Sequence, residues 1–364
     1  MPVQHSDQYD NITFTVETQK VATRAKSDNK YVKYDSNIHP EQMGVFGYQA
    51  NSQTSDHTLL NDFNNQQVTF DKTQSTWEYG EPKKWEDYKD ARFFDFLAYM
   101  PYQANTANTE KQASITIQTD AAKNTETYTL SVPYNPTTYE SASPFVFDSK
   151  NAPIICALPE HREVKDADGT KKSFDHTIRF KFDQTLIGYK LLFKLDPKMG
   201  AIRQFHIKKV QITGEKIPTS GTITRNFTYN KKTQEWTASG IQWTNITLQN
   251  LTKDNPVIIP FKETVVTSTD YAQWGETFYT IPYAAFEPTI QVTYDVEMKA
   301  QDGKTIVTRE NVTSSIVLNE SNFKGFNSST TTTATIYPIR ILIQPRYLYV
   351  LTDQDAYTGH LLID

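Results

Sequence analysis

Histidine and cysteine side chains are the usual metal ligands and activated nucleophiles of proteins, so their spacing is the first feature to consider. The seven histidines run from His5 to His360 with no H-x3-H or HExxH spacing and no cysteine partner. We therefore expect no metal site and no cysteine–histidine nucleophile. The G-x-S-x-G, Walker and G-x-G-x-x-G motifs of hydrolases and nucleotide-binding proteins are absent from the sequence as well.

Carboxylates are numerous, 42 in all, but none lies in a recognisable catalytic frame. The stretch DADG at 166–169 begins like a calcium loop and lacks the downstream ligands, so we interpret it as a plain turn. The single cysteine, Cys156, lies in the apolar run APIICALPE and is interpreted as a small buried hydrophobic residue. The sequence therefore predicts a protein that is not an enzyme and has no cofactor.

The charge pattern limits the possible partners. The net charge is −5 at pH 7, and the Lys and Arg residues are scattered along the chain. Nucleic acids and anionic membrane surfaces are bound by clustered basic residues, so neither is an expected partner. No stretch of the sequence approaches the ~20 apolar residues that cross a bilayer.

The composition indicates which elements must carry the side chains. Aromatic residues make up 13% of the chain, and aromatic and β-branched residues favour strands. Short alternating runs separated by turn residues predict an all-β fold built from sandwiches. Among the expected strands are Gly44–Ala50, Arg92–Tyr99, Thr127–Val132, Phe174–Phe182 and Thr289–Met298.

The length of 364 residues predicts two domains. The most polar connection near the middle of the chain is Pro159–Lys172. We therefore place an N-terminal β-sandwich at residues 1–165 and a C-terminal β-sandwich at residues 166–364.

The stretch NITFTVETQK begins with a clear strand pattern. Ile12, Phe14 and Val16 alternate with polar residues, which predicts a strand over residues 11–18 with these three side chains buried. Residues 19–30 then form a polar, charged linker with Arg24 in its middle. A well-formed strand is thus joined to the rest of the chain through a segment that a protease could cut.

Five stretches of the sequence form a set of motifs. The longest is TWEYGEPKKWEDYKDARFFDFLAYMPY at 76–102, in which two tryptophans precede an F-x-AY-x-P strand. The others are QMGVFGYQA at 42–50, FDHTIRFKF at 174–182 with IKKVQITG at 207–214, TRA at 23–25, and the final run from Arg340 to Asp364. Taken in order, these motifs resemble the fimbrillin-like proteins of Bacteroidetes, the major and minor subunits of type V pili. The resemblance implies two tandem antiparallel β-sandwiches of the transthyretin-like, Greek-key type.

The resemblance also implies a fate for the first strand. Members of this family are exported as lipoproteins to the outer membrane and cell surface, so a signal peptide and a lipidated cysteine are expected upstream of Met1. An arginine-specific protease of the gingipain type then cuts the linker, here between Arg24 and Ala25. The first strand, whose pocket-filling residues here would be Ile12, Phe14 and Val16, leaves its groove.

In the same family a neighbouring subunit's C-terminal strand takes the vacated place by β-augmentation. The possible donor strand here is 347–364, and the candidate donor residues are Tyr347, Leu348, Tyr349, Val350 and Leu351. The same apolar pattern also fits an ordinary last strand of a sandwich, so both interpretations stay open. The implied partners are other pilin subunits, the protease, and ligands on host or bacterial surfaces.

The sequence thus predicts a non-enzymatic structural pilin or cell-surface adhesin of a fimbrium. One alternative is a carbohydrate-binding surface lipoprotein, which would need a flat platform of exposed aromatic side chains. The candidates for that platform are Trp236, Trp243 and Trp274. A second alternative is a β-sandwich glycosidase, which would need two carboxylates about 5–10 Å apart in a cleft.

Overall fold

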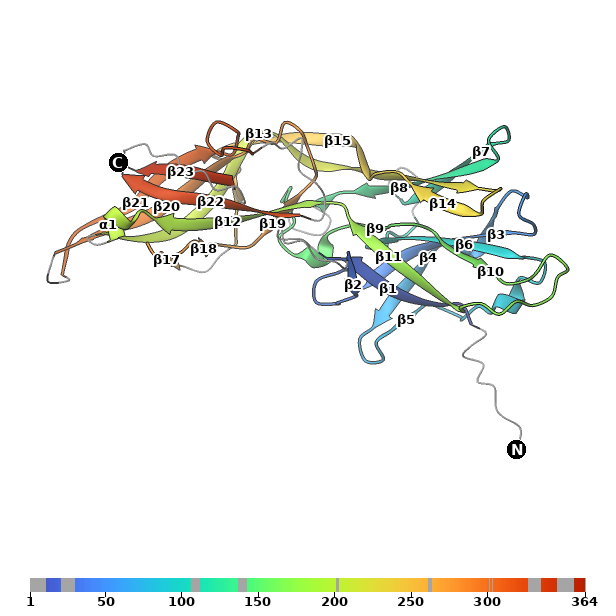
Figure 1. Cartoon of the computed structure of the whole chain (residues 1–364). Coiled ribbons are helices and arrows are strands. Elements are labelled where there is room, and N and C mark those ends of the chain that lie inside the picture. The colour runs from blue at the N-terminus through green and yellow to red at the C-terminus, as the bar shows by residue number, and fades with distance from the viewer. Residues whose placement is uncertain are drawn as a thin grey trace.

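In the computed structural model, β-strands form two elongated lobes that follow each other end to end (Figure 1). The all-β fold predicted from the composition is confirmed. Residues are described over the ranges 11–20, 30–105, 112–136, 143–200, 203–260, 264–300, 302, 304–326, 335–345 and 357–363.

The first lobe packs two sheets face to face. One sheet has the strand order β2-β1-β11-β9-β6-β3-β4-β5, with β10 paired to β6, and the other contains β7, β8, β14 and β15 on the C-terminal part of β13. Its strands are β1 (Thr13–Gln19), β2 (Tyr31–Lys33), β3 (Gln42–Ala50), β4 (Thr58–Asp71), β5 (Thr76–Glu78), β6 (Phe93–Met100), β7 (Ser114–Asp120), β8 (Thr125–Tyr134), β9 (Ile154–Cys156), β10 (Glu160–Glu163), β11 (Thr177–Gln184), β14 (Glu235–Ala238) and β15 (Gln242–Leu251). Two short 3-10 helices, η2 (Trp85–Asp87) and η5 (Ser149–Asn151), lie between these strands.

The second lobe packs a five-stranded sheet of order β18-β12-β22-β23, with β19 on β12, against β20, β21 and the N-terminal part of β13. Its elements are β12 (Ile187–Leu195), α1 (Pro197–Gly200), β16 (Val257–Ile258), β17 (Thr264–Val266), β18 (Ala272–Gln273), β19 (Phe278–Thr280), β20 (Thr289–Lys299), β21 (Thr305–Val317), β22 (Ile336–Pro345) and β23 (Tyr357–Ile363). Most pairings in both lobes are antiparallel, but β1 with β11, β12 with β22, and β22 with β23 run parallel.

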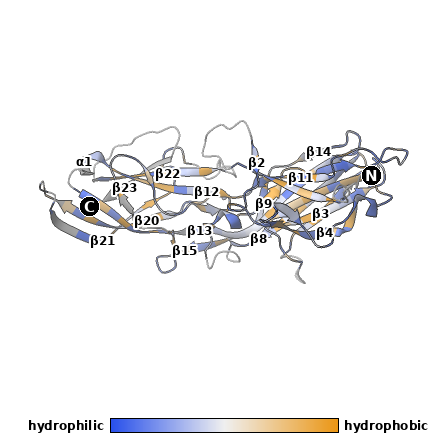
Figure 2. Cartoon of the chain, turned by 90° about the horizontal axis from the view of Figure 1, so that it is seen from below, coloured by the Kyte–Doolittle hydropathy of each residue, from blue (hydrophilic) through white to orange (hydrophobic). Residues whose placement is uncertain are grey.

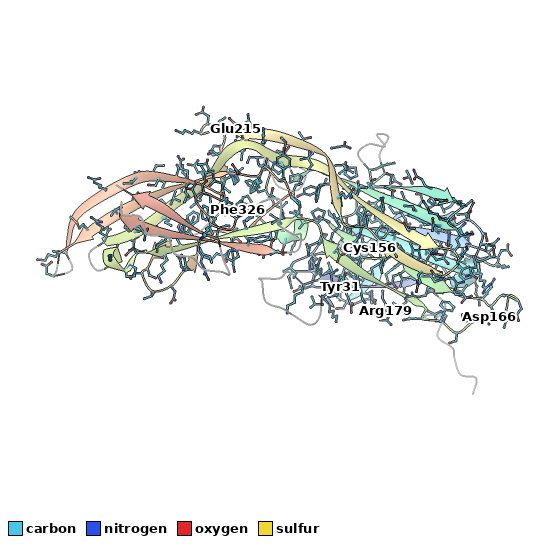
Figure 3. The ribbon with its side chains drawn as sticks, turned by 45° about the horizontal axis from the view of Figure 1, so that its top comes forward. Tyr31, Cys156, Asp166, Arg179, Glu215 and Phe326 are labelled. Carbon is cyan, nitrogen blue, oxygen red and sulfur yellow. The ribbon has the colours of Figure 1, made fainter. Side chains whose placement is uncertain are left out.

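Strand β13 (Arg203–Asn230) runs through both lobes and joins them. Its N-terminal part pairs with β20, and its C-terminal part pairs with β8. Between these parts the register with β15 shifts at Gly214, whose φ of +146° favours glycine. A Cβ atom there would also come within 3.2 Å of the Pro288 backbone. The bend lies beside Glu215, at the top of the second lobe above Phe326 (Figure 3).

Each lobe has its own hydrophobic core. Apolar residues line the inward faces of β3, β9 and β11 in the first lobe and of β12 and β20 in the second (Figure 2). The first core continues along the chain as far as Leu186 and includes Ile223 and Phe227 of β13, whereas the second begins with Phe145 and resumes at Ile187. The change from one core to the other therefore comes later in the chain than the predicted boundary after residue 165.

The polar segment that suggested that boundary is part of the first lobe. Strand β10 pairs with β6 inside the first sheet, and the chain then turns at Asp166–Gly169, where the Gly169 N–H donates to the Asp166 carbonyl at 3.0 Å. Asp166 lies at the end of the first lobe that points away from the second (Figure 3). The polar composition thus reflects an exposed turn, as interpreted for DADG, and not a connection between lobes.

Candidate functional site

Strand β1 is an interior strand of the first sheet. It runs parallel to β11 from the pair Thr13–Thr177 to the pair Thr18–Phe182, and antiparallel to β2 from Glu17–Lys33 to Gln19–Tyr31 (Figure 1). Its backbone is therefore hydrogen-bonded on one side to a strand more than 150 residues away in the sequence.

The inward side chains of this first strand belong to the core of the first lobe. Ile12, Phe14 and Val16 are 1%, 3% and 6% exposed, whereas Thr15 and Glu17 are exposed. The burial predicted from the alternation is confirmed. The Phe14 ring stacks on Phe180 of β11 at a centroid distance of 5.8 Å. Its edge contacts are with Phe63, Tyr79 and Phe96, at centroid distances of 6.1, 5.5 and 6.1 Å.

The N-terminal end of β1 is held by the loop after β5. The Ile12 N–H donates to the Lys83 carbonyl at 2.8 Å, and the Tyr79 hydroxyl donates to the Ile12 carbonyl at 2.8 Å. Both backbone groups of Ile12 are thus satisfied although the residue precedes the regular strand.

The C-terminal end of β1 leads into a hairpin. The Lys20 N–H donates to the Lys30 carbonyl at 2.9 Å, so residues 21–29 connect two hydrogen-bonded positions. Beyond the hairpin, the Tyr31 hydroxyl donates to Asp183 Oδ1 at 2.7 Å. Arg225 of the opposite sheet donates to Asp183 Oδ2 at 2.9 Å.

A groove of about 640 Å³ borders β1. Its apolar lining comes from Phe14 and Val16 of β1 and from Tyr34, Phe70 and Trp77. The Tyr34 ring lies 4.9 Å, between centroids, from each of the rings of Phe70 and Trp77. Lys33, Lys72 and Arg179 form part of its rim. The groove therefore gives access to the core beside β1 while β1 is in place.

The predicted processing and donor positions lie outside the described residues. These positions are Arg24, Ala25, Tyr347, Leu348, Tyr349, Val350 and Leu351. The chain is described again from Tyr357, where β23 pairs in parallel with β22 and occupies the end of the five-stranded sheet. In the described part of the chain, β23 has no strand on its other side.

A buried charged cluster in the first lobe was not anticipated from the sequence. His57 Nε2 lies 2.8 Å from Asp95 Oδ2, and His57 Nδ1 lies 2.5 Å from Glu126 Oε2. Asp95 also contacts His161 Nδ1 at 2.8 Å and accepts a hydrogen bond from Trp236 Nε1 at 2.8 Å. Asp95 and Glu126 are fully buried, so these contacts join β6 to β8 and hence one sheet of the lobe to the other.

The contacts set the protonation states of this cluster. Burial lowers the pKa of His57, but the hydrogen bonds and charges of Asp95 and Glu126 outweigh it and raise the pKa to about 9. Burial raises the pKa of Glu126, but His57 and Lys231 lower it to about 2. A charged histidine between two carboxylates is therefore the stable form at neutral pH. This arrangement joins the two sheets of the lobe through buried ion pairs.

The tryptophans proposed for a carbohydrate platform are packed into the protein. Trp274 is 1% exposed. Trp236 and Trp243 are half-buried, and their Nε1 groups donate to Asp95 and to the Thr185 carbonyl. They do not form a flat exposed surface. Among the described residues, no group of three or more His, Cys, Asp or Glu side chains is arranged to hold a metal ion.

Comparisons with known proteins give structural matches only. No family model and no curated protein matches the chain. A fimbrial protein from Bacteroides vulgatus is 15% identical with a TM-score of 0.48, and the match covers 91% of this chain and 95% of that one. A protein from Bacteroides uniformis assigned to cell adhesion is 13% identical with a TM-score of 0.41, covering 94% of each chain.

A fimbrial protein from Bacteroides ovatus is 11% identical with a TM-score of 0.39, and the match covers 97% of this chain and 50% of that one. The names of these structures agree with the resemblance to fimbrillin-like proteins in the sequence motifs. Identities this low give no information about ligands or partners. In the described part of the chain, no helix is long and apolar enough to span a membrane.

Proposed function

We propose that the chain is a non-enzymatic, fimbrillin-like structural subunit of a surface fimbria, or a surface adhesin, that assembles by exchange of its first strand. The observation that carries this proposal is that β1 is an interior strand of the first core and yet is tied to the chain only through the hairpin segment 21–29. One cut in that segment frees a complete core strand.

The loss of β1 would leave a template for another strand. Strand β11 would lose its partner over Thr177–Phe182, and the rings of Phe63, Phe96 and Phe180 would lose the Phe14 side chain between them. Unpaired backbone groups and an apolar channel together favour the pairing of a further extended segment. A replacement strand would therefore need the same features as β1, namely backbone pairing with β11 and apolar side chains at alternate positions.

The donor in this proposal is the C-terminal segment 347–364 of a neighbouring subunit. Its regular part, β23, pairs with one strand in the described part of the chain, whereas an interior strand pairs with two. The donor and the channel lie on different lobes, so the contact between subunits is head to tail and gives open chains.

Processing in this proposal requires an arginine-specific protease that cuts between Arg24 and Ala25. The subunit would act on the outer surface of the cell after export and lipidation. Its partners would be other subunits of the fimbria, and an adhesin role would add a ligand on a host or bacterial surface.

The experiment is to digest the protein with an arginine-specific protease and follow its size by light scattering. The full-length chain is expected to polymerise after the cut, whereas an Arg24→Lys variant and a variant ending at Pro345 are expected to stay monomeric. Monomeric full-length protein after the N-terminal fragment has dissociated would contradict the proposal. Equal polymerisation of the variant ending at Pro345 would show that the donor lies elsewhere.

A further inference from the structure

The hydrogen bond between Tyr31 and Asp183 crosses over strand β1. We propose that Tyr31, Asp183 and Arg225 form a latch that closes over the outer face of β1 at its C-terminal end and limits how fast the strand can leave. That the latch retains β1 is inferred from the contacts of the intact chain. Only its role in assembly rests on the function proposed above.

The strand register places the latch across β1. Tyr31 of β2 lies opposite Gln19 of β1 on one side, and Asp183 follows Phe182, the partner of Thr18, on the other. Adjacent strands lie about 4.8 Å apart, so β2 and β11 are separated by about twice that distance. The contact of 2.7 Å between Tyr31 and Asp183 therefore spans the full width of β1.

The burial pattern places the latch on the outer face. Val16 and Thr18 point into the core, whereas Glu17 is exposed and Gln19 is half-buried. Lys181, which is exposed and paired with Glu17, has its ammonium group 5.7 Å from the centroid of the Tyr31 ring. The ring thus covers the solvent side of the strand end. Tyr31 lies at the end of the first lobe that faces the second (Figure 3).

Charged partners fix the acceptor of the latch. Asp183 contacts Arg225 at 2.9 Å and Lys30 Nζ at 3.1 Å, and the same Arg225 nitrogen donates to the Cys156 carbonyl at 3.0 Å. Burial raises the pKa of Asp183, but the hydrogen bonds from Tyr31, Arg225 and Lys30 hold it below its ordinary value. Because the acceptor is an ionised carboxylate, the bond from Tyr31 is of the stronger, charge-assisted kind.

The latch belongs to the part of the chain that remains after processing. Tyr31 follows the segment 21–29, so a cut in that segment leaves Tyr31 on the subunit. Of the contacts of Tyr34, the bond from its N–H to the Val16 carbonyl at 3.3 Å is lost with β1, whereas the bond from its hydroxyl to the Pro40 carbonyl at 2.8 Å lies within the retained chain. The residues of the latch are therefore all present on the processed subunit and can re-form the same contact over an incoming strand.

The test on the intact chain is amide hydrogen exchange of β1 in a Tyr31→Phe variant. The variant keeps the ring and loses only the hydroxyl, so exchange over Thr13–Gln19 is expected to accelerate about tenfold or more, in line with the loss of a hydrogen bond to a charged group. Exchange in β20 and β21 of the second lobe is expected to stay unchanged. The matched control is Tyr88→Phe, which removes the 2.8 Å bond between Tyr88 and Asp62 in the same lobe.

Equal exchange of β1 in the two tyrosine variants would overturn the latch. If Tyr31→Phe does not fold, the Asp183→Asn variant, which keeps the shape of the acceptor and loses its charge, is measured by the same readout. After a cut at Arg24, release of the N-terminal fragment from Tyr31→Phe is expected to be faster than from the native protein by the same factor. Release of the fragment at an unchanged rate would contradict the latch but not the proposed function. Fast release without polymer formation supports the latch and contradicts the proposed function.

Discussion

The two terminal strands of this protein are held in different ways. Strand β1 lies between β2 and β11, and three of its side chains lie in the first core. Strand β23 lies at the end of its sheet and pairs with β22 alone in the described part of the chain. The first strand thus pairs on both sides and packs into a core, whereas the last strand pairs on one side in the described part of the chain. In the proposed assembly, β1 is the strand that is replaced, and β23 belongs to the segment that replaces it.

The two lobes also differ in what lies inside them. In the described part of the chain, the buried charged residues are in the first lobe: His57, Asp95, Glu126, Asp183, Arg225 and Lys231. The buried polar residues of the second lobe, in the described part of the chain, are the uncharged Gln211, Thr280 and Gln344. Ion pairs thus join the two sheets inside the first lobe. The second lobe depends on apolar packing.

The largest effect is expected from the Phe14→Ala substitution. Phe14 is 3% exposed and contacts four aromatic rings, so its removal leaves a cavity in the first core. The free energy of unfolding of the first lobe should fall by about 3–5 kcal/mol in denaturant titrations. Val32 of β2, which lies opposite Thr18 and is 40% exposed, gives the control. The Val32→Ala substitution should change the free energy of unfolding by less than about 0.5 kcal/mol. Similar losses in both variants would mean that packing does not retain β1.

A smaller, pH-dependent effect is expected from His57→Gln. The pKa of His57 is raised to about 9, above its ordinary value of 6.5, so its stabilisation is complete below pH 6.5 and is lost as the pH rises through 9. The stability difference between the native protein and the variant should therefore shrink by about 3 kcal/mol from pH 6.5 to pH 10.

The comparison with the variant also removes the contribution of other groups. Burial lowers the pKa of His39 to about 4. The contribution of His39 to the stability of the protein is therefore lost as the pH falls from 6.5 through 4, and this loss is the same in the native protein and the variant. Thermal unfolding at a series of pH values gives the difference directly. A difference that does not vary with pH would contradict a charged His57 in the folded state.

The smallest effect on the first lobe is expected from ending the chain at Pro345. This change removes β23, whose partner in the described part of the chain is β22 of the second lobe. The free energy of unfolding of the first lobe should change by less than about 0.5 kcal/mol, because distant sites contribute independently to stability. Hydrogen exchange resolved by segment measures both lobes in one sample. A large loss of protection in β1 or β11 would show that the terminal strand supports the first lobe.

The sequence was a sufficient basis for the local features of the first strand. The alternation of Ile12, Phe14 and Val16 predicted both strand and burial, because the side chains of a strand point to alternate faces. Its parallel partner β11 could not be predicted, because nothing in the pattern of either strand identifies a partner so far along the chain. The polar run after Pro159 indicated a domain boundary because exposed turns and linkers share the same composition.

The buried cluster illustrates what sequence analysis missed. Its one local signal is Asp95, a lone carboxylate in the apolar run FFDFLAYM of β6. A buried charge needs partners, but His57, Glu126 and His161 come from three separate segments that only the fold brings together. The Tyr31–Asp183 contact was missed for the same reason.

The most direct test of the account is to identify which segment occupies the place of β1 in the assembled protein. A photo-crosslinking p-benzoylphenylalanine at position 79 would lie beside Phe14, whose ring is 5.5 Å from that of Tyr79. In the uncut monomer, mass spectrometry should find crosslinks to the peptide 11–20 of the same chain. In the polymer formed after cleavage, the crosslinks should move to the C-terminal residues 346–364 of another copy. Crosslinks that remain on residues 11–20 in the polymer would contradict strand exchange at this site.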